Sequence, residues 1–226
     1  MNAAPLDPRR FDPWLFDLDG TLVDSAPDLH RALDHALARA GLPPVDEALV
    51  RRSVGQGARS LLAAGMAHHR PERPAAAPEL DALLPVFLAH YEAHIADRSR
   101  LYPGVLPCLD ALAERGVALA CVTNKYAQLA EGLLRALGVR DRFGAVIGGD
   151  TLPVRKPDPA PLREACRRLG RPETAALMVG DSGTDVRAAR AAGMPVICVT
   201  YGYDQGEDVR TLGADLLVDS LDTLLA

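Results

Sequence analysis

Two aspartates follow an apolar run near the start of the chain, in the segment Leu-Phe-Asp-Leu-Asp-Gly-Thr of residues 15–21. Trp14 to Phe16 read as a strand, and alternation along an extended chain would place Asp17 and Asp19 on the same side. Two carboxylates so close repel each other, and their burial is costly unless a cation or a proton intervenes. The segment therefore predicts a strand end that presents two acids to a hard metal ion and a substrate. A strand followed by an ordinary Asx turn is the alternative.

Polar residues follow three further apolar runs, at or soon after the end of each run: Thr123 and Asn124, Lys156, and Asp181 and Asp185. If these runs are parallel strands, their carboxyl ends lie at one edge of the sheet, and the polar groups converge on the two aspartates. Together they supply a hydroxyl, an amide, an ammonium and two more carboxylates. That set suits Mg²⁺ and a transferring phosphoryl group. Taken singly, each residue could instead cap a helix or lie in a solvated loop.

The positions of these groups depend on an alternating pattern of strands and helices. Apolar runs of strand length recur near 14–18, 117–123, 145–149, 175–180, 195–200 and 215–218. Helical patterns lie between them, near 105–115, 125–137, 159–169, 183–192 and 220–225. This alternation predicts an α/β fold, a Rossmann-like doubly wound parallel sheet with helices on both faces. Because the runs are continuously apolar, the sheet should be buried on both sides.

Residues 25–98 interrupt the alternation and contain only helical patterns, near 25–40, 46–52, 57–69 and 78–97. We therefore predict an all-α cap domain at 25–98, inserted after the first strand, and a catalytic core made of 1–24 and 99–226. The segment 53–59 is the candidate specificity loop, because Gly55 and Gly57 let the backbone approach a small ligand and Arg59 could pair with a carboxylate. A helix start with a solvated arginine is an equally good interpretation.

Composition excludes several classes of partner. The chain has 226 residues, of which 48% are apolar, and a formal net charge of −5 with no evident basic patch. Nucleic acid and acidic membrane surfaces are therefore poor partners. No apolar run is long enough to span a bilayer, and residues 1–10 lack the layout of a signal peptide, so we expect a cytoplasmic protein, either monomer or homodimer. Only Lys125 and Lys156 are lysines among 25 basic residues, which suggests sites that need a compact ammonium.

The motifs together resemble the haloacid dehalogenase superfamily, in its branch of phosphatases with a helical cap after the first strand. The resemblance covers nearly the whole chain and rests on Asp17-Leu-Asp19-Gly-Thr, Thr123-Asn124, Lys156-Pro157 and Gly180-Asp181-Ser-Gly-Thr-Asp185. Within that branch, the segments 22–27, 122–125, 146–150 and 199–203 are most similar to bacterial phosphoglycolate phosphatases. Phosphatases of sugar phosphates share several of these weaker marks.

The resemblance implies a Mg²⁺-dependent phosphomonoester hydrolase. Asp17 would be the nucleophile and form an aspartyl-phosphate, and Asp19 would be the general acid and base, which requires it to carry a proton when substrate binds. The side chains of Asp17 and Asp181 and the backbone carbonyl of Asp19 would hold the metal. Lys156 would offset the charge of the phosphoryl group, and Asp185 would orient Lys156 or a metal-bound water. Hydrogen bonds to the phosphoryl oxygens would come from the side chains of Thr123 and Asn124.

The small phosphorylated substrate that the resemblance favours is 2-phosphoglycolate, which would yield glycolate and phosphate. The alternatives are a sugar-phosphate phosphatase, including one for N-acetylmuramic acid 6-phosphate, and a β-phosphoglucomutase-like phosphotransferase. A more distant alternative is a non-catalytic regulatory protein on the same scaffold. The sequence does not decide whether Lys125 contacts phosphate, the cap or only water.

Overall fold

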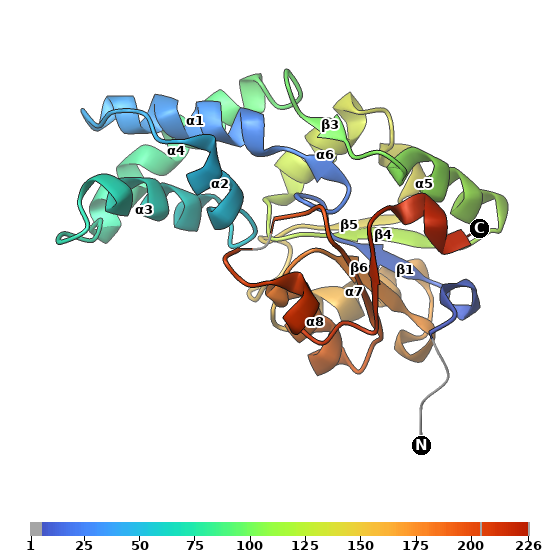
Figure 1. Ribbon diagram of the computed structural model, residues 1–226. Coiled ribbons are helices and arrows are strands. Elements are labelled where there is room, and N and C mark those ends of the chain that lie inside the picture. The colour runs from blue at the N-terminus through green and yellow to red at the C-terminus, as the bar shows by residue number, and fades with distance from the viewer. Residues whose placement is uncertain (1–5, 204, 226) are drawn as a thin grey trace.

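A parallel sheet forms the centre of the molecule. The computed structural model describes residues 6–203 and 205–225, and in them six strands pair in the order β5-β4-β1-β6-β7-β8 (Figure 1). The strands are β1 (Trp14–Phe16), β4 (Leu119–Val122), β5 (Ala145–Ile147), β6 (Leu177–Gly180), β7 (Val196–Val199) and β8 (Leu216–Val218). Trp14 of β1 pairs with Leu119 on one side and Leu177 on the other. The carboxyl ends of β4, β1 and β6 therefore lie side by side.

Helices cover both faces of the sheet because β1 and its neighbours are apolar on both sides. Trp14 and Phe16 point into a core that includes side chains from α5 (Val105–Glu114) and α6 (Ala127–Ala136). Leu15, between them, points into a second core with α7 (Ala160–Leu169) and α8 (Gly183–Ala192). In Figure 1, α5 and α6 lie above the sheet, and α7 and α8 lie below it. The predicted doubly wound α/β fold is confirmed.

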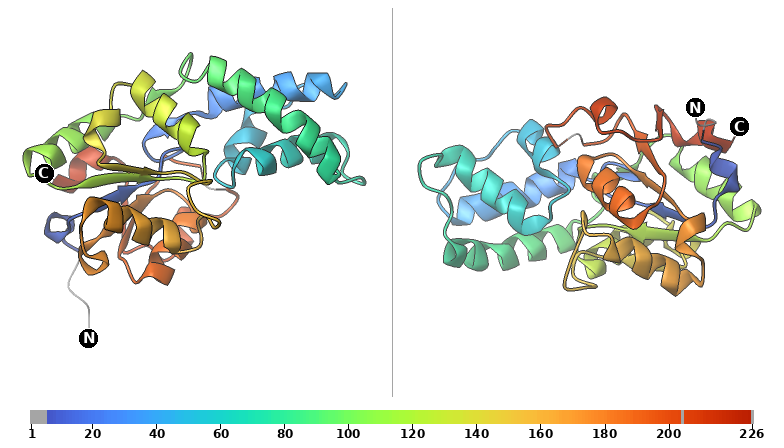
Figure 2. Two further views of the ribbon diagram at one scale, coloured as in Figure 1. Left: turned by 180° about the vertical axis from the view of Figure 1, so that it is seen from behind. Right: turned by 90° about the horizontal axis from the view of Figure 1, so that it is seen from below.

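Four helices between residues 26 and 93, a fully described stretch, form a unit beside the sheet (Figure 2). They are α1 (Ala26–Arg39), α2 (Glu47–Ser53), α3 (Ala58–His69) and α4 (Ala77–Ala93), and we call them the four-helix unit. Their apolar faces meet in a core of their own, with Leu33, Leu62 and Phe87 almost fully buried. The inserted helical block is therefore present, whereas its predicted limits as a separate domain, residues 25 and 98, stay a prediction.

The two connections between the sheet and the four-helix unit pair with each other. Strand β2 (Val23–Asp24) runs antiparallel to β3 (Arg100–Leu101), with Val23 opposite Leu101. No sequence pattern predicted this pair, because each strand has only two residues. Two other differences are local. The segment predicted as a helix at 220–225 is the 3₁₀ helix Leu221–Leu225, and the strand expected from residue 175 begins at Leu177, after the 3₁₀ turn Glu173–Ala175.

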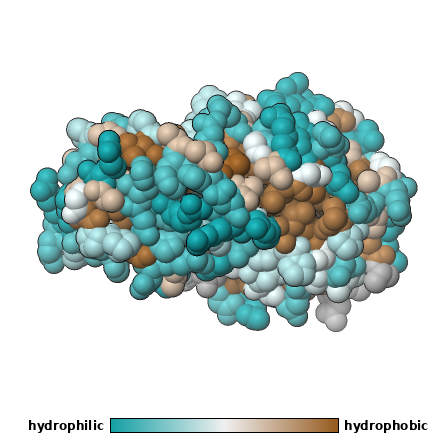
Figure 3. Space-filling model, turned by 90° about the horizontal axis from the view of Figure 1, so that it is seen from above, coloured by the Kyte–Doolittle hydropathy of each residue, from teal (hydrophilic) through white to brown (hydrophobic). Residues whose placement is uncertain are grey.

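The surface seen from above is mostly hydrophilic, and the larger of its apolar areas lies over the α/β part of the molecule (Figure 3). Among the described residues, no helix combines the length and the apolar character that a bilayer crossing requires. The four cysteines, Cys108, Cys121, Cys166 and Cys198, are buried and free. Burial raises the pKa of the Cys166 thiol to about 11, so it stays a neutral core side chain at neutral pH.

The buried side chain of Asp28 ties the first helix of the four-helix unit to the connection that returns to the sheet. Asp28 lies in the first turn of α1 and is fully buried. Its Oδ2 accepts hydrogen bonds from the backbone N–H of Arg98 (2.9 Å), the backbone N–H of Ser99 (2.7 Å) and the Ser99 hydroxyl (2.8 Å). The carboxylate thus satisfies backbone donors that the return connection would otherwise bury unpaired.

We expect Asp28→Ala to lower the free energy of unfolding by about 3 kcal/mol, because it leaves these buried donors without an acceptor. Urea denaturation followed by circular dichroism would measure the change. Asp81→Ala is the matched control, because Asp81 is an exposed α4 residue paired with Arg59, and its loss should cost less than about 0.5 kcal/mol. Equal losses for the two variants would contradict this account.

Candidate active site

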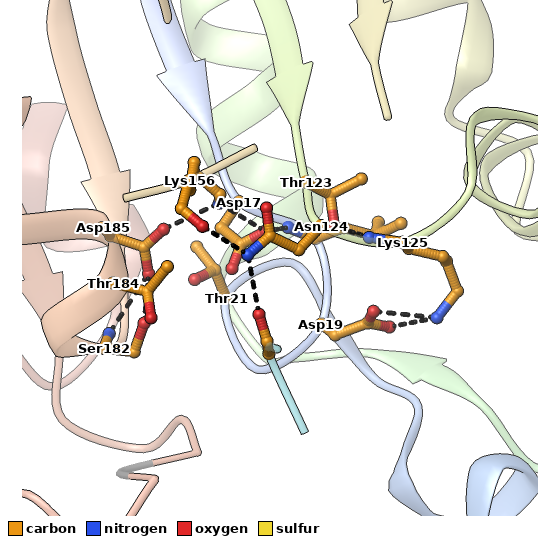
Figure 4. Close-up of polar contacts among 12 residues, drawn as sticks. Asp17, Asp19, Thr21, Thr123, Asn124, Lys125, Lys156, Ser182, Thr184 and Asp185 are labelled. Atoms are coloured by element: carbon orange, nitrogen blue, oxygen red, sulfur yellow. Dashed lines mark hydrogen bonds and ion pairs between the residues drawn. The ribbon is translucent and has the colours of Figure 1, made fainter. Parts of the chain in front are cut away.

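The carboxyl ends of β1, β4 and β6 gather most of the residues singled out in the sequence (Figure 4). Asp17 directly follows β1, Thr123 directly follows β4, and Asp181 directly follows β6. Lys156 comes from the loop after β5, and Asp185 comes from the first turn of α8. All five residues are buried: Asp185 has no exposed surface, and Lys156 is 3% exposed. The site is therefore a set of charged and polar groups removed from water.

The Lys156 ammonium lies between two carboxylates. Its Nζ is 2.9 Å from Asp17 Oδ1 and 2.7 Å from Asp185 Oδ1. Burial lowers the pKa of Lys156, but the two carboxylates outweigh it and leave the pKa above its usual value. Asp185 is itself fixed, because its Oδ2 accepts from the Ser182 hydroxyl (2.8 Å) and from the backbone N–H of Ser182 and Asp181. Asp185 thus holds Lys156 against Asp17.

Three carboxylates crowd together beside this lysine. One oxygen each of Asp17, Asp181 and Asp185 lies within 4.8 Å of the others, and all three residues are buried. Burial raises the pKa of Asp17 to about 7, although Lys156 opposes the rise. Burial, Asp185 and Asp17 raise the pKa of Asp181 well above its usual range. The crowding is costly for three anions, and an all-oxygen set suits a hard divalent cation, so this cluster could hold a metal ion.

Asp181 is fixed from two sides. Its Oδ1 accepts from the Thr21 hydroxyl (2.7 Å), and its Oδ2 accepts from the backbone N–H of Tyr203 (2.7 Å). The Tyr203 hydroxyl donates to Asp24 (2.6 Å) and accepts from the backbone N–H of Ser25 and Ala26 (2.9 Å each). Tyr203 therefore links the candidate metal ligand to the start of the four-helix unit. Sequence reasoning did not assign this role, because an aromatic residue in a loop gives no such signal.

Asp19 contacts a different lysine from Asp17. Both of its carboxylate oxygens accept from Lys125 Nζ, at 2.7 and 2.8 Å, and its Oδ1 accepts from the Ser25 hydroxyl (2.5 Å). Strand β1 ends at Phe16 and the chain then turns, so the two acids lie just past the strand end rather than within the strand. The backbone N–H of Leu18 donates to Asp17 Oδ1 (2.7 Å) at that turn. Both carboxylates nevertheless line the same cavity.

Lys125, whose contacts the sequence left open, is a buried member of the site. Its ammonium binds Asp19 and lies 4.7 Å from the ring centroid of Tyr91, on α4 of the four-helix unit. Burial lowers the pKa of Lys125, but Asp19 and then Tyr91 outweigh it, so the pKa stays above its usual value. The side chain is therefore charged at neutral pH and spans from the sheet to the four-helix unit.

Asn124 makes contacts that differ from those expected, whereas Thr123 does not. Asn124 Nδ2 donates to the backbone carbonyls of Gly55 (3.0 Å) and Lys156 (2.9 Å), so both of its N–H groups are already used. Instead of a free donor for a phosphoryl oxygen, Asn124 is a brace between the specificity loop and the loop that carries Lys156. Thr123 Oγ1 accepts from the backbone N–H of Lys125 (3.2 Å), which leaves its hydroxyl hydrogen available to a ligand.

The candidate specificity loop reaches the site through its glycines but not through its arginine. Gly55 and Gly57 have φ of +108° and +91°, values that favour glycine, and both line the cavity. A Cβ at Gly57 would also meet the Arg155 guanidinium at 3.0 Å. Arg59 instead pairs with Asp81 and donates to the Ala77 carbonyl on the surface of the four-helix unit. The predicted position of Arg59 in the site is thus corrected, because the exposed Asp81 offers it a nearer carboxylate.

A cavity of about 40 Å³ lies at the site, between the sheet and the four-helix unit. Its polar lining includes Asp17, Asp19, Thr123, Lys125 and Tyr91. The apolar lining comes mainly from the four-helix unit and α6: Leu29, Val54, Ala58, Leu61, Phe87 and Leu129. Sequence reasoning did not find Tyr91, since an aromatic residue on an amphipathic helix reads as part of the core. The arrangement thus gathers buried carboxylates, two ammonium groups and a cluster that could hold a metal ion around one cavity.

Comparisons with known proteins agree with this geometry. Residues 14–193 match the family model of haloacid dehalogenase-like hydrolases. A phosphoglycolate phosphatase from Rhodospirillum rubrum is 48% identical over 93% of this chain and 88% of that protein. One from Mesorhizobium japonicum is 44% identical over 93% and 91%. The crystal structure of a predicted phosphoglycolate phosphatase from Haemophilus somnus superposes with a TM-score of 0.89 at 36% identity, over 96% of this chain and 97% of that one.

These matches span both the sheet that carries the charged cluster and the four-helix unit that closes the cavity. The chain therefore belongs to the haloacid dehalogenase-like hydrolase family, and it is an enzyme that resembles the phosphatases of that family.

Proposed function

We propose that this enzyme is a Mg²⁺-dependent phosphomonoester hydrolase that works through an aspartyl-phosphate on Asp17, with 2-phosphoglycolate as its substrate. The observation that carries the proposal is the Lys156 ammonium, held between Asp17 and Asp185 beside a buried carboxylate cluster. In the proposed reaction, this arrangement would supply a nucleophile, a cation and oxygen ligands for a metal ion at one edge of the cavity. The relatives named phosphoglycolate phosphatases support the choice of substrate.

The charges at the site favour a divalent metal ion. Four carboxylates gather at the strand ends, and two buried ammonium groups, Lys125 and Lys156, face them. A divalent cation would balance the remaining charge, and Mg²⁺ prefers oxygen ligands of this kind. The side chains of Asp17 and Asp181 and the backbone carbonyl of Asp19 would hold it. When bound, Mg²⁺ would offset the negative charge of the phosphoryl group that Asp17 must approach.

The residues of the chain would then act in two steps, which form the aspartyl-phosphate and then hydrolyse it. The Asp17 carboxylate, oriented through its Oδ1 by Leu18 N–H and Lys156, would attack phosphorus while the bond to the leaving oxygen breaks. Asp19 would give its proton to that oxygen. In the second step Asp19 would take a proton from the water that attacks phosphorus, and Asp17 would be released. Lys156 and the Thr123 hydroxyl would bind the phosphoryl oxygens.

The four-helix unit would act as the cap, with residues 25–98 as the proposed domain. It supplies most of the apolar wall of the cavity, so its closure would exclude water from the aspartyl-phosphate. Leu61 and Phe87, on its side of the cavity, offer no hydrogen-bond partner to sugar hydroxyl groups. This apolar lining favours 2-phosphoglycolate over the sugar-phosphate alternatives.

Phosphate release tests the substrate. We expect Mg²⁺-dependent turnover with at least about tenfold higher kcat/KM for 2-phosphoglycolate than for glucose 6-phosphate or N-acetylmuramic acid 6-phosphate, and loss of turnover in EDTA. Preference for a sugar phosphate would keep the chemistry and reject the substrate. Conversion of glucose 1-phosphate without release of phosphate would indicate a phosphotransferase, and no reaction with any ester would favour a regulatory protein.

Replacement of the nucleophile tests the mechanism. Asp17→Asn should lower kcat by at least about 10³-fold, because an amide cannot form the aspartyl-phosphate. Asp110→Asn is the matched control, since Asp110 is an exposed α5 residue paired with Arg142, and it should keep full activity. Wild-type enzyme quenched in acid during turnover should carry phosphate bound to protein, and the Asp17 variant should not. An active Asp17→Asn enzyme would reject this mechanism.

A further inference from the structure

Two polar groups in the cavity have no substrate contact assigned to them in the chemistry described above. Lys125 and Tyr91 both line the cavity, and they lie opposite each other across the junction of sheet and four-helix unit. Tyr91 is fully buried, and Lys125 is 8% exposed. Within residues 6–203 and 205–225, the Tyr91 hydroxyl meets no partner at good hydrogen-bond geometry. A buried hydroxyl in that condition is costly unless a ligand satisfies it.

Lys125 has donor capacity to spare. A lysine ammonium carries three N–H groups, and Asp19 accepts at its two carboxylate oxygens. The ammonium lies over the face of the Tyr91 ring, so a group that reaches the Tyr91 hydroxyl also comes near the cation. A donor hydroxyl and a cation in one apolar pocket favour an anionic acceptor with two oxygens. The chemical class that fits is a carboxylate.

The rest of the cavity limits the chemistry of the molecule that carries this carboxylate. Asp17, the proposed nucleophile, lines the same cavity as Lys125 and Tyr91, so one ligand could reach all three side chains. Leu61, Phe87 and Leu129 line the wall and offer no polar partner to sugar hydroxyl groups. Hydroxyl groups buried against such a wall would lose hydrogen bonds to water without replacement.

We propose that the Lys125 ammonium and the Tyr91 hydroxyl form the subsite for the substrate's carboxylate, and that this pair selects short phosphorylated carboxylates over esters that lack one. The inference rests on the proposed phosphatase function and adds the residues that choose its substrate. Arg59, which the sequence suggested for this task, points away from the cavity and pairs with Asp81. The selecting cation thus comes from the end of β4, and the selecting hydroxyl comes from α4.

Tyr91→Phe tests the subsite because it removes only the hydroxyl and keeps the buried ring. The two assayed esters are 2-phosphoglycolate and 2-hydroxyethyl phosphate, which carries CH₂OH in place of the carboxylate. We expect the ratio of kcat/KM values, 2-phosphoglycolate over 2-hydroxyethyl phosphate, to fall about tenfold, mainly through KM for 2-phosphoglycolate. Lys125→Met should lower the ratio further, since it removes the charge at similar volume. An unchanged ratio in both variants would overturn the proposal.

Tyr102→Phe is the matched control. The Tyr102 hydroxyl is also buried without a partner at good geometry among the described residues, but Tyr102 does not line the cavity. This variant should leave the ratio unchanged. If Tyr102→Phe lowers the ratio as much as Tyr91→Phe does, the effect is one of general packing and the subsite is rejected.

Binding separates a failure of the subsite from a failure of the phosphatase function. Calorimetry with Asp17→Asn protein and Mg²⁺ should show about tenfold weaker binding of 2-phosphoglycolate when Tyr91→Phe is added, and a smaller change for 2-hydroxyethyl phosphate. This pattern would support the subsite even if wild-type enzyme released no phosphate, a result that would reject the proposed function alone. Equal weakening for the two esters would reject the subsite alone, provided that wild-type enzyme hydrolyses 2-phosphoglycolate.

Discussion

The burial of four carboxylates and two ammonium groups at one sheet edge is the constraint on which the structure depends. Each of these groups would lose its hydration on folding, and the loss is tolerable only when every charge has a partner. Lys156 serves Asp17 and Asp185, and Lys125 serves Asp19. The backbone donors at the start of α8 satisfy the second oxygen of Asp185. The local structure around the strand ends is thus largely a set of partners for buried charge.

The same constraint joins the four-helix unit to the sheet. The Ser25 hydroxyl donates to Asp19, and Asn124 donates to the Gly55 carbonyl, so groups at the site are bonded directly to the first helix turn and to the glycine loop. Tyr203 bonds both to Asp181 and to Asp24, in the connection between the two parts. Movement of the four-helix unit would therefore change the surroundings of the carboxylates. The hydrogen bonds that hold the carboxylates in place therefore also hold the four-helix unit against the sheet.

The sequence was sufficient to predict the parts of the molecule that follow from hydrophobic periodicity. Continuous apolar runs identified the strands of the sheet, and the rule that parallel strands present their carboxyl ends together brought Asp17, Thr123, Lys156, Asp181 and Asp185 to one place. These residues lie at strand ends or in the first turns beyond them, where backbone topology alone fixes position. Little freedom remained for side chains to change that result.

The sequence was insufficient where a side chain had to choose between neighbouring partners. Arg59 was near enough in sequence to suggest a place in the site, yet Asp81, on another helix, draws it to the surface. Asn124 was expected to bind phosphate, but carbonyls from two distant loops occupy its amide. Strands β2 and β3 are too short to produce a pattern. These outcomes depend on distances between elements, which only the folded chain provides.

The two lysines show that side-chain contacts, which the sequence did not predict, matter for function. In a chain that otherwise uses arginine for positive charge, both lysines lie buried at the site, each against a different member of the first aspartate pair. A compact ammonium can sit between carboxylates from separate elements, whereas a planar guanidinium would impose its own fork. In the proposed mechanism, Lys156 serves the nucleophile and the phosphoryl group. Lys125 faces Tyr91 of the four-helix unit, where the part of the proposed substrate beyond the phosphate would lie.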